Sequence, residues 1–290
     1  MIARWVGALA GGALAASALA QNADIAPFLE IRPTVIATSE RTSFEWFDQR
    51  YQSSLVGLRG VLPNGTRVRF AQRLARLPGE VDRELIDEAF IERRGEWRIG
   101  RQRMPFGQRQ VVNESLWGGR YDTRLAFGVN ASVYAFDEGR GRATGAGIRV
   151  GEEVGISLMA GTDLGMQPTS QPFIERDPSE VRLGAGHDLI LGGDASFRYG
   201  GMQGTAEHVL FLNPSPGQRS YALTDISLRA GPPVSQWGIT MGFHRRWDQR
   251  NAIFTLEVDA PAESGIVYRV FTRLEGGLAL QGGFGMTIRF

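Results

Sequence analysis

The sequence lacks cysteine, lysine and, beyond residue 20, any long apolar run. Without cysteine, the chain has no disulfide framework, thiol nucleophile or zinc–thiolate site. All 32 basic residues are arginine, whose planar fork suits contacts with carboxylates and phosphates. No later apolar stretch approaches the roughly 20 residues that a membrane-spanning helix needs. If the mature chain crosses a membrane, we expect it to cross with strands.

Histidine is also scarce, and the chain contains only His187, His208 and His244. A barrel hydrolase would need a Ser-His-Asp/Asn set, and no serine lies in a Gly-x-Ser-x-Gly pattern. The sequence contains no His-Glu-x-x-His, EF-hand or P-loop pattern either. We therefore predict no catalytic residue, no metal site and no cofactor. A barrel hydrolase is the least favoured alternative.

The first 20 residues are typical of a cleaved signal peptide. Arg4 is positively charged, residues 5–14 are apolar or small, and Ala18-Leu19-Ala20 fits the A-x-A cleavage pattern. Removing this segment takes away Arg4 and no acidic residue, so the mature chain has no net charge. Nucleic-acid binding is not expected, because it requires a basic excess. Residues 21–290 are predicted to form a single domain.

The mature region alternates apolar and polar residues with the period of two that is typical of half-buried strands. Residues 278–290 show this pattern most strictly. On an earlier strand, Arg67, Arg69 and Arg73 share one face and Phe70 lies on the other. Three arginines on a lipid-facing surface would each cost roughly 2–4 kcal/mol at the midplane. The pattern therefore predicts an all-β, transmembrane, antiparallel up-and-down β-barrel with a wet lumen.

The periodic segments number fifteen, whereas bacterial barrels have an even number of strands. We predict about fourteen strands, with residues 102–124 as a loop without a clear period. Sixteen strands is the first alternative if a further strand lies near residues 108–116, and twelve is a second alternative. The last strand should close the barrel against residues 29–37. Twelve strands or fewer would favour a filled lumen and sixteen would favour a pore.

A local resemblance extends this interpretation. The sequence Glu88-Ala89-Phe90-Ile91 is followed, after a turn, by Trp97 and the run that ends in Met104-Pro105-Phe106-Gly107. This hairpin resembles the one in outer-membrane porins of the phosphate-selective O/P type. The matched positions are Arg98, Gly100, Pro105, Phe106 and Gly107.

The resemblance implies a water-filled barrel in an outer membrane, with the segment after Pro-Phe-Gly folded inward as a constriction that includes residues 113–121. The terminal Phe290 resembles the insertion signal that the barrel assembly machinery reads. The chain is short for this family and has no lysine, so phosphate selectivity is not implied.

The expected function is passive diffusion of small hydrophilic solutes through the lumen, with a weak preference for anions. Outer-membrane lipid, the assembly machinery and the solutes or anions are the expected partners, and a homotrimer is compatible with the resemblance. The aromatic residues Trp97, Trp237, Trp247, Tyr268 and Phe290 are expected in interfacial girdles. The predicted pore-lining or constriction residues are Arg67, Arg69, Arg73, Arg98, Arg103, Glu114, Arg269 and Arg273.

Two alternatives remain open. The arginines could pair with Glu30, Glu84, Glu96 or Asp194 and hold the wall together without guiding anions. The whole barrel could also be non-conducting, and serve as an anchor or bind a surface partner through its loops. Strand number and conductance distinguish these alternatives from a pore.

Overall fold

The computed structural model describes residues 24–48, 52–75, 85–109, 111–112, 115–137, 144–162, 164, 187–214, 219–231, 237–248, 252–261, 265–275 and 278–290. The predicted signal peptide and the predicted site residue Glu114 lie outside these ranges. No helix among the described residues is long and apolar enough to cross a membrane.

Almost all of the described chain forms one antiparallel sheet of eighteen strand segments. A single turn of 3-10 helix, Ala126–Gly128, lies between two of them. The segments are β1 (Asp24–Ile31), β2 (Thr34–Thr38), β3 (Thr42–Glu45), β4 (Leu55–Val61), β5 (Arg67–Arg73), β6 (Ile86–Arg93), β7 (Trp97–Arg103), β8 (Ser115–Arg124), β9 (Asn130–Asp137), β10 (Thr144–Gly151), β11 (Val154–Thr162), β12 (His187–Tyr199), β13 (Met202–Pro214), β14 (Tyr221–Ala230), β15 (Gly238–Arg246), β16 (Ala252–Pro261), β17 (Ile266–Glu275) and β18 (Leu278–Arg289).

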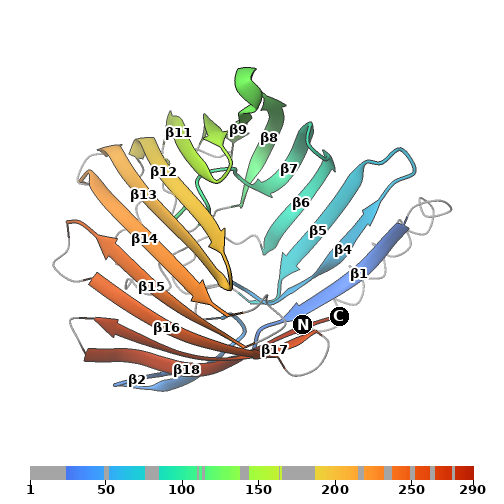
Figure 1. Cartoon of the computed structure of the whole chain (residues 1–290). Coiled ribbons are helices and arrows are strands. Elements are labelled where there is room, and N and C mark those ends of the chain that lie inside the picture. The colour runs from blue at the N-terminus through green and yellow to red at the C-terminus, as the bar shows by residue number, and fades with distance from the viewer. Residues whose placement is uncertain are drawn as a thin grey trace.

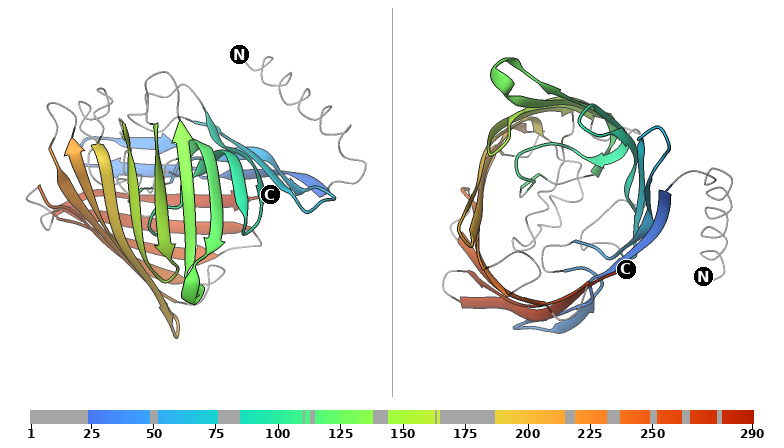
Figure 2. Two further views of the ribbon diagram at one scale, coloured as in Figure 1. Left: turned by 90° about the horizontal axis from the view of Figure 1, so that it is seen from above. Right: turned by 45° about the vertical axis from the view of Figure 1, so that its right-hand side comes forward.

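The sheet closes on itself to form a barrel (Figures 1 and 2). The last strand, β18, pairs with β2 and, at its end, with β1, while β1 pairs with β4. β1 and β2 are two parts of one strand broken at Arg32-Pro33, and β3 and β4 are two parts of the next. The eighteen segments therefore make a closed barrel of sixteen strands. The predicted closure of the last strand against residues 29–37 is confirmed.

The prediction of about fourteen strands is wrong, and the alternative of sixteen is confirmed, although the expected position of the additional strand, near residues 108–116, is not. The additional strand is β8, which lies in residues 102–124, where we had expected an unbroken loop. Its outward side carries Trp117 and Tyr121, but Gly119 lies between them. Its inward side carries Gly118, Arg120 and Asp122. Neither face gives the clear apolar alternation that identifies a strand, so the period was missed.

Residues that pair across neighbouring strands lie on the same face of a sheet, so each face can be followed around the barrel. Arg69 pairs with Phe90, Phe90 with Gly100, and Gly100 with Gly118. This face is the inner one, because the opposite face presents a band of exposed apolar side chains. The band includes Phe70, Ile91, Ile99, Val133, Ile156, Ile226, Met241, Phe254, Val270 and Phe284.

Short turns join the strands at one end of the barrel, which we name the turn end, and longer connections join them at the other, which we name the loop end. The hairpin turn at Pro63-Asn64-Gly65 belongs to the turn end. Gly65 has a positive φ of 79°, and the Asn64 side chain accepts a hydrogen bond from the Thr66 amide at 3.0 Å. Such turns need a residue that tolerates left-handed backbone, and glycine does so at little cost.

Candidate functional site

The connection from β7 to β8 folds into the barrel (Figure 2). We name its described residues, 104–109 and 111–112, the inward segment. Met104, Phe106, Val111 and Val112 are at most 2% exposed. They pack against apolar residues of the inner wall, which include Leu116, Tyr134, Phe136, Met159, Ile190, Val209, Phe211 and Leu223. The main apolar cluster of the molecule therefore lies inside the barrel, between the inward segment and the wall.

Polar contacts fix the inward segment to strands β10–β13. The Gly107 amide donates to the Ser157 hydroxyl at 2.9 Å, and the Gly107 carbonyl accepts from the Arg149 guanidinium at 3.0 Å. The Gln108 side-chain amide donates to Asp194 at 2.7 Å. The wall thus holds both backbone polar groups of Gly107, which satisfies buried groups that would otherwise be costly.

Gly107 is required by the local geometry. Its φ is +51°, and a Cβ at this position would lie 2.1 Å from a carboxylate oxygen of Glu207. A Cβ on Gly192 would likewise lie 2.6 Å from the Phe106 ring. The Pro105-Phe106-Gly107 turn therefore approaches the wall more closely than larger residues would permit. Residues 115–121 were expected in the constricting loop, but they belong to β8 instead.

An arginine-rich wall faces the lumen on strands β4–β8. Arg59 lies directly opposite Arg69, and Arg98 lies opposite Arg120. The guanidinium groups of Arg59 and Arg69 lie 5.7 and 4.9 Å from the centre of the Phe28 ring. Such contacts favour a cation over an aromatic face and hold these side chains against the wall.

Most of these arginines form ion pairs within the wall. Arg69 contacts Glu88 at 2.5 Å, and Arg120 contacts Asp122 at 2.5 Å. Arg98 contacts Glu92 at 2.6 Å, and Arg103 contacts Asp87 at 3.0 Å. Arg67 has a half-exposed side chain and lies 4.0 Å from Glu92. Three of the four carboxylates that were predicted as partners contact other arginines: Glu30 contacts Arg32 and Arg289, Glu96 contacts Arg93, and Asp194 contacts Arg149. The fourth, Glu84, lies outside the described residues. Among the described residues, Arg59 has no carboxylate partner.

Arg109 adds a cation at the tip of the inward segment, where the sequence had given no signal for it. Burial lowers its pKa to about 10, and the nearby positive charges of Arg120, Arg103 and Arg98 act in the same direction. No described carboxylate lies within ion-pair distance of its guanidinium group. Arg109 also has a positive φ of 60°, which is uncommon outside glycine.

The facing side of the lumen is rich in carboxylates. Asp194 pairs with Glu207, and Glu207 with Asp225, on successive strands β12, β13 and β14. All three are at most 6% exposed. Arg149 contacts Asp194 at 2.6 Å, and His244 contacts Asp225 at 2.5 Å. Three carboxylates therefore lie next to one another on this arc, whereas on strands β4–β8 arginines lie next to one another.

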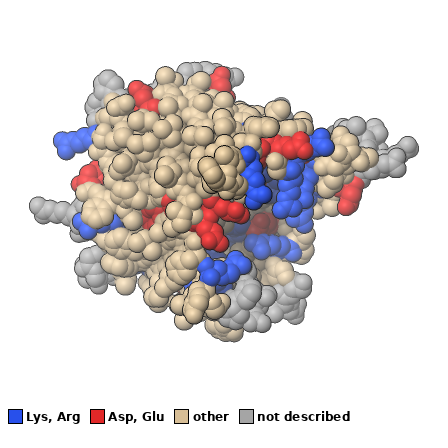
Figure 3. Space-filling view, turned by 45° about the horizontal axis from the view of Figure 1, so that its top comes forward, with Lys and Arg blue, Asp and Glu red and all other residues tan. Residues whose placement is uncertain are grey.

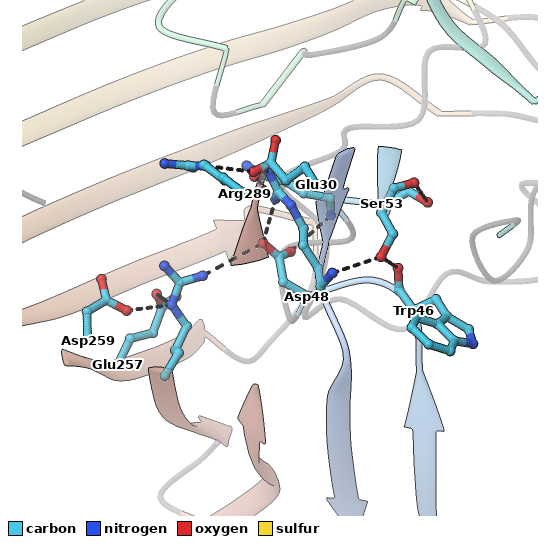
Figure 4. A network of polar contacts seen from close by, with 11 residues as sticks. Glu30, Trp46, Asp48, Ser53, Glu257, Asp259 and Arg289 are labelled. Atoms are coloured by element: carbon cyan, nitrogen blue, oxygen red, sulfur yellow. Dashed lines mark hydrogen bonds and ion pairs between the residues drawn. The ribbon is translucent and has the colours of Figure 1, made fainter. Parts of the chain in front are cut away.

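A second segment also turns inward, where β3 leads into β4. We name residues 46–48 and 52–54 the second inward segment. Phe47 is 3% exposed and packs against Ile36 and Phe271 on the inner wall. Asp48 contacts Arg32 at 2.9 Å and Arg269 at 3.7 Å, which joins the first strand to the next-to-last (Figure 4).

The remaining predicted residues lie on or near the closing strands. Arg269 belongs to the network of Figure 4 and contacts Asp259 at 2.6 Å. Arg73 and Arg273 are buried, at 7% and 6% exposure. Gly100, on β7, has a positive φ of 122°. Phe290 is exposed, and its backbone amide donates to the Leu29 carbonyl at 2.9 Å.

Two cavities open at the turn end of the lumen. One, of about 590 Å³, is lined by Arg198, Arg229, Asp259 and Arg269 among others. The other, of about 360 Å³, lies against the arginine-rich wall at Arg59, Arg67 and Arg69. Figure 3 shows basic and acidic side chains gathered around a hollow in this face. The site is therefore a charged lumen, narrowed from one side by the inward segment.

Comparison with known proteins identifies the fold. No protein-family model matches the sequence, and no curated protein matches it. The chain is similar in structure to the outer membrane channel DcaP of Acinetobacter baumannii, with a TM-score of 0.57, 10% identity and coverage of 93% of this chain and 98% of that one. An anion-selective porin from Comamonas acidovorans gives a TM-score of 0.58 at 13% identity, covering 93% and 100%.

A loop L8 deletion mutant of OmpT, an outer membrane protein of Vibrio cholerae, gives a TM-score of 0.61 at 8% identity, again covering 93% and 100%. The alignments run over nearly the whole of each chain. The sequence identities are too low for a shared function to be inferred from them. The fold of this chain is therefore that of a sixteen-stranded, porin-like β-barrel.

Proposed function

We propose that this protein is an outer-membrane porin, through which small hydrophilic solutes diffuse passively. One observation carries the proposal: the wall has an apolar outer face, while its inner face bears paired arginines and carboxylates around a narrowed lumen. Barrels of about sixteen to eighteen strands leave an aqueous channel, whereas barrels of eight strands fill with side chains. An apolar outer face and a polar interior are the arrangement that lipid requires of a barrel.

A weak preference for anions is the second part of the proposal. Most lumen charges are paired and contribute little net field. Arg59 and Arg109 have no described carboxylate partner, and both lie on the arginine-rich side of the passage. At neutral pH Arg109 is charged, because its pKa of about 10 lies well above 7. Charged side chains at a narrow point set the ion selectivity of a pore.

The cellular setting follows from the same proposal. Export through the signal peptide, recognition of Phe290 by the assembly machinery and contact with outer-membrane lipid are all expected of such a protein. A homotrimer is proposed because the similar OmpT of Vibrio cholerae is described in a trimer form. The hairpin of residues 88–107 supports a porin of the O/P type, without phosphate selectivity.

The test is to reconstitute the mature chain in planar bilayers and measure conductance and reversal potential in a salt gradient. We expect stepwise conductance and a modest chloride preference. Arg59→Glu with Arg67→Glu should shift the reversal potential towards cations, because it reverses two lumen charges. The matched control is Arg41→Glu with Arg94→Glu, which alters two exposed arginines outside the lumen. Absence of conductance steps would favour the non-conducting alternative.

A further inference from the structure

A polar group interrupts the apolar outer face of the barrel on strands β13–β15. His208 pairs with Thr224, and Thr224 with Arg245. Their neighbours Val209 and Leu223 belong to the apolar cluster inside the barrel, so alternation directs these three side chains outward. Trp247, just after β15, is 52% exposed and lies beside them. We name these four residues the outer polar cluster.

Hydrogen bonds fix the Trp247 ring. Its indole N–H donates to the Thr224 hydroxyl at 2.8 Å, and that hydroxyl lies 2.8 Å from Nδ1 of His208. A threonine hydroxyl has one hydrogen to donate, and the indole nitrogen is only a donor. The Thr224 hydroxyl therefore accepts from Trp247, and it shares a second hydrogen bond with His208 Nδ1 whose direction depends on the imidazole tautomer. This chain positions the indole on the outer surface.

Arg245 lies on the ring that this chain positions, with its guanidinium 4.2 Å from the Trp247 ring centre. Its Nε is buried and has no hydrogen-bond partner among the described residues. The nearby carboxylate of Asp248 is engaged by Arg246, at 2.8 and 3.0 Å. Among the described residues, Arg245 thus carries a positive charge on the outer face without a carboxylate to balance it.

The position of Arg245 indicates which kind of anion could balance its positive charge. It is the next-to-last residue of β15, at the loop end, and the residues opposite Phe243 and Arg245 on β16, Phe254 and Ala252, are apolar. An unpaired arginine is costly among hydrocarbon chains but not at the level of lipid headgroups. Tryptophan at the end of a strand is typical of that level. A phosphate is the anion found there, and arginine contacts it with directed hydrogen bonds.

We propose that Arg245 and Trp247 form a binding site for the phosphate of an anionic lipid headgroup, with Thr224 and His208 as positioning residues for the indole. The site rests on the proposed function only in requiring that the barrel be inserted in a membrane. It is separate from the lumen, because its side chains point away from the inner wall. Lipid binding and conductance can therefore be measured and can fail independently.

The test uses the mature barrel in detergent micelles, with native mass spectrometry to count bound lipids and subunits. Phosphatidylglycerol and phosphatidylcholine with identical acyl chains are the probes. We expect the wild type to prefer phosphatidylglycerol, and Arg245→Gln to reduce that preference about tenfold, as expected for one charged hydrogen-bonded contact. Trp247→Leu should reduce it by a smaller factor. Arg219→Gln, at an exposed arginine of the same end, should leave it unchanged.

The outcomes separate this site from its rivals. An unchanged preference in Arg245→Gln, or an equal loss in Arg219→Gln, would overturn the proposal in favour of diffuse surface charge. Loss of an oligomer in Arg245→Gln, without loss of lipid preference, would assign the face to a second copy of the chain. Conductance in neutral bilayers is measured on the same preparations. A wild type that conducts but shows no lipid preference would contradict only the lipid site. A barrel that binds the lipid but does not conduct would contradict only the proposed pore.

Discussion

At the scale of single residues, the lumen is defined by a few positions with unusual backbone or unbalanced charge. Gly107 and Arg109 both have positive φ, two residues apart, in the tight turn that carries the inward segment. A non-glycine residue costs of order 1–3 kcal/mol in such a conformation and persists only where the surroundings enforce it. The anchoring of Gly107 to Ser157 and Arg149 provides that enforcement. Arg109 is thereby held inside the barrel, near Arg98, Arg103 and Arg120.

The charge of Arg109 should make ion selectivity depend on pH. Burial and neighbouring arginines lower its pKa to about 10, so Arg109 is charged at neutral pH and loses its proton as the pH rises through about 10. Ordinary arginines stay charged there, since their pKa exceeds about 12. We expect the chloride preference to fall between pH 7 and about 10.5. Reversal potentials at both pH values measure this, and Arg109→Gln should be the control that shows no fall.

Gly107→Ala should displace the inward segment. The added methyl group would lie 2.1 Å from a Glu207 oxygen, on backbone with a φ of +51°. The left-handed conformation alone costs about 1–2 kcal/mol for a residue with a Cβ. We expect a larger and noisier single-channel conductance as the turn leaves the wall. Gly119→Ala is the control, because a Cβ there meets nothing within 4 Å. Equal conductance in the two variants would contradict this role for Gly107.

At the scale of elements, sequence periodicity located strands well where one face was apolar and the other was charged. Strand β5, with Arg67 and Arg69 opposite Phe70, is the clearest case. The same criterion failed for β8, whose Gly118 and Gly119 occupy both faces in turn. The period-two pattern also does not show the break at Arg32-Pro33, where the first strand is interrupted and the neighbouring strand turns into the barrel. Proline in a strand marks such irregular positions, because it cannot donate a ladder hydrogen bond. Which carboxylate pairs with which arginine depends on register, and composition does not determine it.

The second inward segment leads to a prediction about stability. Asp48 is buried and contacts both Arg32 and Arg269, so it ties the first strand to the closing strands. Asp48→Asn removes one partner of a buried ion pair and leaves two arginines less balanced. Such changes cost about 3 kcal/mol of unfolding free energy. Urea unfolding of the refolded barrel measures the loss.

The matched control for Asp48→Asn is Glu96→Gln. Glu96 pairs with Arg93 at 3.1 Å, with both side chains more than half exposed. Exposed pairs contribute less than about 1 kcal/mol, so this variant should unfold like the wild type. If the two variants lost the same free energy of unfolding, the second inward segment would not be what ties the first strand to the closing strands.

At the scale of the whole molecule, the barrel and its polarity could be predicted from the sequence, and the strand number could not be fixed. The argument from arginines that cannot face lipid identified the inner face of β5 correctly, and the terminal strand identified the closure. The parity of the strand count located the error in the region that contains β8. The two inward segments depend on long-range contacts, such as Gln108 with Asp194, that no local pattern encodes.

Adjacent residues on one strand test the assignment of faces. Ile226 is exposed on the outer face of β14, whereas Ser227 lies on the inner face and lines the 590 Å³ cavity. Ile226→Arg should cost about 2–4 kcal/mol of folding free energy in bilayers, if that surface meets hydrocarbon. Ser227→Arg should fold normally, because the cavity has room for the side chain, but should lower the conductance. Folding into vesicles, followed by gel mobility, measures the first effect, and planar-bilayer recording measures the second. Equal tolerance of arginine at both positions would mean that the apolar band does not face lipid.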